Sequence, residues 1–93
     1  METFPYKEVR TLLKEYELVE VLIKLDIEPT LFVETFTSYP HQGRYSVIML
    51  KSDINLIYLI LKNTPRSKFY STLNERLDQL VWNTMRNFIL NHS

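Results

Sequence analysis

The chain has 93 residues, with 11 basic and 11 acidic side chains, so its formal net charge is zero, and it contains no cysteine. This length fits one domain over residues 1–93, and the lack of cysteine excludes disulfide scaffolds and thiolate metal sites. The balanced charge disfavours nucleic-acid binding, which needs basic residues concentrated on one face, and here they are scattered among acidic ones.

Large apolar side chains are frequent, at 45% of the chain, although alanine is absent and Gly43 is the sole glycine. A domain of this length buries only about 60–65% of the surface of its unfolded chain. We therefore expect part of the apolar surface to be covered by another protein or by a second copy of the chain.

Residues 5–25 carry the clearest helical pattern. Helical spacing predicts one apolar stripe, formed by Val9, Leu12, Leu13, Tyr16, Val19 and Ile23. A second stripe on the opposite face contains Leu18, Val21, Leu22 and Leu25. The pattern predicts a helix whose second half is packed on both sides.

Pro29 suits the start of a second, short helix over residues 30–39. The aromatic and β-branched side chains of residues 31–37 also permit a strand. A loop follows around Pro40 and Gly43, and it carries His41.

A third helix is predicted over residues 44–63, because Val47, Leu50, Ile54, Ile57 and Leu61 repeat at spacings of three and four. The competing interpretation is a strand at residues 45–50, followed by a shorter helix capped by Ser52 or Asp53.

Thr64 and Pro65 are suitable N-cap and first residues for a fourth helix that runs to about Leu90. This helix should lie antiparallel to the third, since few residues join them. The predicted fold is all-α, a small bundle of three long helices plus one short helix. The alternative is an α+β fold with a short hairpin or edge strands at residues 31–37 and 45–50.

The candidate partner-binding residues lie on the fourth helix and on the second stripe of the first helix. The alternative for Trp82 is internal packing, if the first or second helix covers it or if the helical phase differs. The alternative for the second stripe is packing against the second segment. Trp82 lies about 140° from the centre of the apolar face of the fourth helix, and Ile89 points within about 20° of the same direction. Tryptophan is also enriched at interface hot spots. The full set joins this face to the second stripe of the first helix: Trp82, Ile89, Met85, Leu18, Leu22 and Leu25.

Catalytic and cofactor signatures are absent from the sequence. One glycine cannot form a phosphate-binding loop, and His41 and His92 lack companions at metal-ligand spacing, so we expect both in solvent. The acidic side chains fall on expected polar faces or at caps, outside any expected cavity. We therefore expect no enzyme, no cofactor and no metal.

The expected function is a non-enzymatic protein–protein interaction module that docks through exposed apolar helix faces. Inhibitor, adaptor, immunity or regulatory proteins and assembly subunits belong to this class, and the partner is another protein or a second copy. The alternative is a small helical DNA-binding regulator, because a short turn at residues 63–65 separates two helices and the second of them carries Arg66, Lys68, Arg76 and Arg86.

No signal peptide or membrane-spanning run is visible, so we expect a cytoplasmic protein. The composition, rich in Phe, Tyr, Ile, Asn and Lys, is typical of AT-rich genes such as those of phages or viruses.

Overall fold

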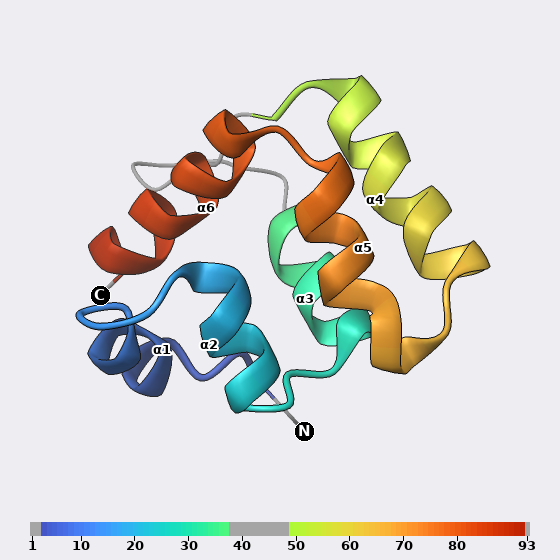
Figure 1. Cartoon of the computed structure of the whole chain (residues 1–93). Coiled ribbons are helices and arrows are strands. Elements are labelled where there is room, and N and C mark those ends of the chain that lie inside the picture. The colour runs from blue at the N-terminus through green and yellow to red at the C-terminus, as the bar shows by residue number, and fades with distance from the viewer. Residues whose placement is uncertain (1–2, 38–48, 93) are drawn as a thin grey trace.

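The computed structural model describes residues 3–37 and 49–92. Within these ranges the chain is helical and contains no strand, which confirms the all-α class (Figure 1). In chain order the elements are α1 (Tyr6–Leu12), α2 (Leu18–Lys24), α3 (Pro29–Thr37), α4 (Lys51–Asn63), the short 3-10 helix η1 (Arg66–Lys68), α5 (Phe69–Arg76) and α6 (Gln79–Asn91). Residues 31–37, the first candidate strand, lie within α3.

The helix predicted over residues 5–25 is two helices. α1 ends at Leu12, and α2 begins after a capping box in which the main-chain N–H of Glu17 donates to Glu20 Oε1 over 3.2 Å. This box satisfies amides that a helix start leaves without partners. The break changes which stripe is buried, because Leu18, Val21 and Leu22 enter the core whereas Ile23 is 55% exposed.

The last predicted helix is also divided. Leu77 is extended, and the Asp78 carboxylate caps α6 by accepting the main-chain N–H of Leu80 over 2.8 Å. The helical phase therefore restarts at α6. Upstream, η1 precedes α5, so α5 begins at Phe69 rather than directly after Pro65.

The third predicted helix is shorter than expected. α4 begins at Lys51 with Leu50 as its N-cap residue, so neither Ser52 nor Asp53 caps it. Residues 44–48, which include most of the second candidate strand, lie outside the described ranges. α4 and α5 run side by side in opposite directions, as the short connection predicts (Figure 1).

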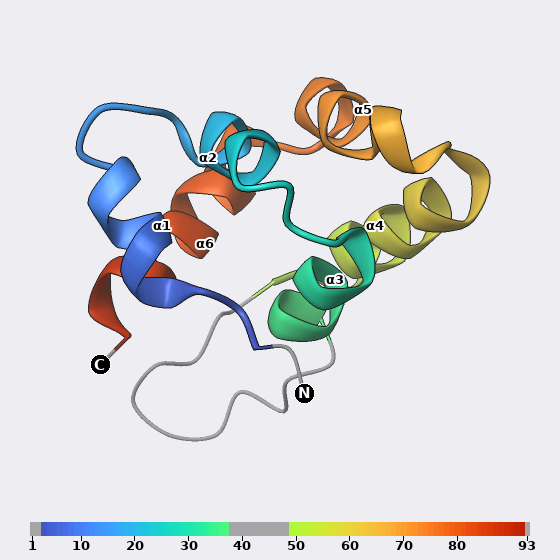
Figure 2. The same cartoon turned by 90° about the horizontal axis from the view of Figure 1, so that it is seen from below.

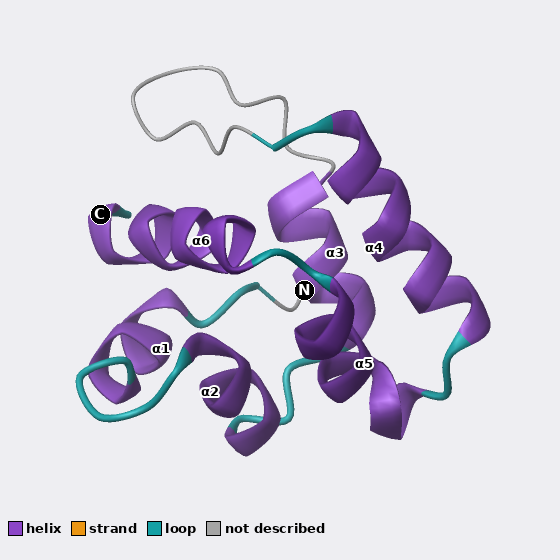
Figure 3. Cartoon of the chain, turned by 45° about the horizontal axis from the view of Figure 1, so that its top comes forward, coloured by secondary structure: helices purple, strands orange, loops and turns teal. Residues whose placement is uncertain are grey.

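The helices form two neighbouring groups (Figure 3). α4 packs against both α3 and α5, while α1 packs against α2 and α6. The view from below separates these groups, and contacts between α2 and α5 join them (Figure 2). Phe32 of α3 lies where the groups meet, with its ring centroid 6.1 Å from that of Phe69 and 6.3 Å from that of Trp82. Aromatic packing therefore joins α3, α5 and α6 in one hydrophobic core.

Candidate functional site

The structure places most of the predicted partner-binding residues in the core instead of on the surface. Trp82 is 4% exposed, and Met85, Ile89, Leu18 and Leu22 are also buried. Leu25 is partly buried against the same core. These six side chains therefore do not form the exposed docking face that we expected from the sequence.

The phase of α6 explains this difference. A continuous fourth helix would place Leu80 on the same apolar face as Leu73 and Leu77, but Leu80 is 72% exposed. In the separate helix α6, the buried side chains follow the spacing i, i+1, i+4, i+7 and i+8, which forms one stripe. They are Val81, Trp82, Met85, Phe88 and Ile89.

Most large apolar side chains of the described residues lie in one hydrophobic core, which combines aliphatic and aromatic residues, or pack against it. Among the described residues, the large apolar side chains that remain exposed are distributed over α2, α4 with its N-cap, and α6. They are Ile23, Leu50, Tyr58, Leu59, Leu80 and Leu90. Single exposed apolar side chains are normal on soluble proteins. A candidate site therefore has to be sought in surface shape and charge.

A surface depression of about 420 Å³ lies between the start of α2 and the first turns of α6. Trp82 and Leu18 supply apolar lining, and the surrounding side chains are mainly polar. The lining residues are Glu17, Leu18, Val19, Glu20, Asn74, Gln79, Trp82, Asn83 and Arg86. Trp82 Nε1 is buried and has no hydrogen-bond partner among the described residues.

This depression continues along α6. A second hollow of about 540 Å³ shares Gln79, Asn83 and Arg86 with it and adds the turn between α1 and α2. A third hollow, of about 370 Å³, shares Arg86 with both and reaches Leu90. We call the three together the α6 groove. Its walls are α1, the α1–α2 turn and the start of α2.

One end of the α6 groove is cationic. The third hollow is lined by Lys7, Arg10, Thr11, Leu13, Lys14, Arg86 and Leu90, with no acidic side chain. Arg10 Nη1 donates to the main-chain carbonyl of His92 over 2.7 Å. The ion pairs found in the described ranges all belong to Arg66, so none neutralises these four cations. We call this third hollow, with its four basic side chains Lys7, Arg10, Lys14 and Arg86, the cationic end.

The sequence contains a signal for this end. Lys7, Arg10 and Lys14 are spaced i, i+3 and i+7, which is the spacing of one helix face. The acidic neighbours that made this group look balanced do not share that face fully, since Glu8 points about 160° away from Arg10. Arg86, which approaches from α6, could not be assigned without the fold.

His92 also differs from the expectation. Its ring stacks on Tyr6, with centroids 3.6 Å apart and planes 9° from parallel, and it is only partly exposed. His41 lies outside the described ranges. In the described part of the chain, no three His, Cys, Asp or Glu side chains converge as metal ligands, and no helix is long and apolar enough to span a bilayer.

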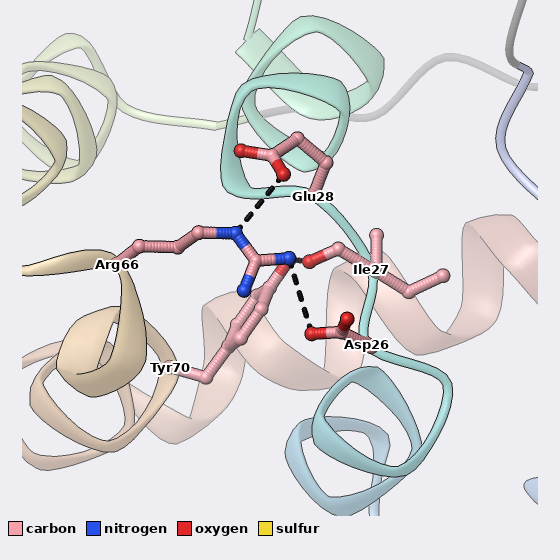
Figure 4. A network of polar contacts seen from close by, with 5 residues as sticks. All are labelled: Asp26, Ile27, Glu28, Arg66 and Tyr70. Carbon is pink, nitrogen blue, oxygen red and sulfur yellow. Dashed lines mark hydrogen bonds and ion pairs between the residues drawn. The ribbon is translucent and has the colours of Figure 1, made fainter.

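A polar network joins η1 and α5 to the α2–α3 connection (Figure 4). Arg66 pairs with Asp26 over 3.1 Å and with Glu28 over 3.0 Å, and these contacts raise the pKa of its guanidinium. The Tyr70 hydroxyl donates to the carbonyl of Ile27 over 2.8 Å. Asp26 has φ of 50°, in the left-handed region that aspartate tolerates better than most residues. The network holds the α2–α3 connection against η1 and α5. Because two carboxylates already bind the Arg66 guanidinium, it is not available to bind a phosphate.

Comparison of the chain with protein-family models, curated proteins and solved structures finds no match.

Proposed function

We propose that this chain is a non-enzymatic protein–protein interaction module that holds a short peptide segment of another protein in the α6 groove. An inhibitor, adaptor, immunity or regulatory protein, or an assembly subunit, would act in this way. The observation that carries the proposal is the continuity of the three hollows, which share Arg86. A cytoplasmic setting is part of the same proposal.

The length of the groove supports a peptide occupant. It follows α6 from Gln79 to Leu90, and eleven steps of a helix cover about 17 Å. An extended chain advances about 3.3 Å per residue, so about five residues would fill the groove. An open groove of this kind offers a linear contact surface instead of an enclosed reaction chamber.

The polar lining supports the same occupant. Asn74, Gln79 and Asn83 present amide groups that both donate and accept hydrogen bonds, as a peptide backbone requires. Gln79 Nε2 donates to Asn83 Oδ1 over 3.2 Å, which orients this pair along α6. The amide groups of Gln79 and Asn83 could instead form hydrogen bonds with the N–H and C=O groups of a bound peptide main chain.

The DNA-binding alternative has less support. Its basic residues were expected on the helix after the turn at Pro65, but Arg66 is held by two carboxylates. The following helix α5 has eight residues and ends at Arg76 beside Glu75, while Arg86 lies on the separate helix α6. Few positive charges therefore remain there to neutralise phosphates.

The test is selection of binders from a random peptide library displayed against the full chain. Selected peptides should bind the unmodified protein and lose affinity for Asn83→Tyr, which places bulk inside the groove. Asn87→Tyr is the matched control, because Asn87 is also exposed on α6 but does not line the groove. Equal binding to both variants, or no enriched peptides, would contradict the proposal.

Self-association is a separate outcome. Light scattering at two concentrations measures whether the partner is a second copy of the chain. A dimer that dissociates in Asn83→Tyr but not in Asn87→Tyr would assign the groove to self-association. The occupant of the groove would then be a second copy of the chain instead of a peptide from another protein.

A further inference from the structure

We propose that the cationic end of the α6 groove binds an acidic segment of the partner protein, with carboxylates facing Lys7, Arg10, Lys14 and Arg86 and one apolar side chain against Leu90. This inference rests on the proposed function and adds the chemistry of the partner.

Charge complementarity carries the inference. The four cationic side chains line one hollow, while the chain as a whole has a net charge of zero. Lys7, Lys14 and Arg86 make no ion pair with any described residue. Carboxylates of a partner would therefore meet cations that no ion pair within the described ranges engages, which favours both the association rate and the orientation of the partner.

The extent of the positive surface limits the length of the acidic segment. Lys7 lies in the first turn of α1 and Lys14 lies just beyond the end of this seven-residue helix, so the positive surface is about as long as α1. Beyond them the groove is lined by Glu15, Glu17 and Glu20. These carboxylates would repel a polyanion that continued through the groove. The pattern therefore favours a few carboxylates over a nucleic-acid backbone, whose charges extend without interruption.

The apolar lining also favours a peptide. Leu90 is 40% exposed at the cationic end, and the buried side chain of Leu13 lines the same hollow. A leucine or aromatic side chain flanked by carboxylates would cover Leu90 while the carboxylates meet the surrounding cations. Phosphate and ribose offer no equivalent apolar group.

The composition of the displayed-peptide pool separates this inference from the proposed function. Enrichment of Asp and Glu beside an apolar residue is the expected result. A pool that depends on the groove, as judged by Asn83→Tyr, but contains no acidic bias would overturn the acidic-segment inference and leave the proposed function standing. If the selected peptides bind Asn83→Tyr as tightly as the unmodified protein, or if no peptides are enriched, both the acidic-segment inference and the proposed function are overturned.

Charge reversal then tests the assigned residues. The probe is a fluorescein-labelled peptide in which acidic residues flank a leucine, measured by anisotropy at low salt. The double variant Lys7→Glu/Lys14→Glu should weaken binding by about tenfold or more. Lys51→Glu/Lys62→Glu is the matched control, because it makes the same charge change at exposed lysines near the two ends of α4.

Equal losses in the two double variants would show a nonspecific charge effect and overturn the inference. A short DNA duplex is the competing probe. If the duplex binds more tightly than the acidic peptide and responds to the same reversal, the cationic end is a nucleic-acid surface, and the inference is overturned. Circular dichroism of each variant confirms that the comparison is between folded proteins.

Discussion

Arg10 ties the first helix to the end of the last one. Its Nη1 donates a hydrogen bond to the main-chain carbonyl of His92, over 2.7 Å and 82 positions along the chain. The His92 ring stacks on Tyr6 of the same first helix. Because the carbonyls at a helix C-terminus carry partial negative charge, a guanidinium is favoured there. The two contacts hold α1 against α6 and so form the cationic end of the groove.

Removing this tie should destabilise the fold. Arg10→Met keeps much of the side-chain bulk but leaves the His92 carbonyl without its charged donor, and should lower the free energy of unfolding by about 1–2 kcal/mol. Lys14→Met removes a charge at an exposed neighbour and should change it by less than about 0.5 kcal/mol. Urea denaturation measures both. Equal effects would mean that the Arg10 contact contributes nothing specific.

Trp82 and Leu80 should respond in opposite ways to truncation. Trp82→Ala opens a cavity beside Phe32 and should cost about 3–5 kcal/mol of stability. Leu80→Ala, at a position 72% exposed, should cost less than about 0.5 kcal/mol. Thermal and urea unfolding test the pair. A free energy of unfolding that is the same in Trp82→Ala as in the unmodified protein would contradict the burial of this side chain.

The fluorescence of Trp82, the single tryptophan, gives an independent check. A side chain that is 4% exposed should be quenched poorly by iodide in the folded protein and strongly after unfolding. Efficient quenching of the native protein would place Trp82 at the surface.

Stability should fall at alkaline pH because of Tyr70. Burial, together with the nearby negative charge of Glu28, raises the pKa of this phenol above its ordinary value of about 10. The folded state therefore holds the proton more tightly than the unfolded state. The protonated Tyr70 hydroxyl therefore contributes its full stabilisation of the folded state below about pH 10, and this stabilisation is lost as the pH rises above that value.

Tyr70→Phe isolates this contribution. At neutral pH the substitution should cost about 1 kcal/mol, since the Ile27 carbonyl loses its donor. Above about pH 10 the difference between the two proteins should narrow, because only the unmodified protein loses stability by ionising Tyr70. Urea denaturation at neutral and alkaline pH measures it, and parallel pH profiles would contradict the assignment.

Helical periodicity predicted the fold class and the regions that carry α1 to α6, because an apolar stripe is a local property of the sequence. It could not predict the breaks near Glu17 and Asp78, where short caps compete with continuation of the helix. Each break resets the phase. For this reason the spacing of one continuous helix leaves Trp82 and Ile89 open to either a partner surface or internal packing, and the structure places both in the core.

The candidate site was less predictable than the fold. The i, i+3, i+7 spacing of Lys7, Arg10 and Lys14 is present in the sequence, but neighbouring acidic residues obscured it. Its meaning depends on Arg86 and Leu90, which reach the same hollow from a helix more than seventy positions later. Such juxtapositions come from tertiary packing, which no local pattern contains.

The most direct measurement is an amide NMR titration of the ¹⁵N-labelled full chain with an acidic peptide from the selected pool. We expect the largest chemical-shift changes in residues 7–14, in α1 and the turn after it, and in residues 79–90 of α6, while the amides of α4 change little. Changes concentrated on α4, or spread evenly over the whole protein, would contradict the assignment of the α6 groove as the partner-binding site.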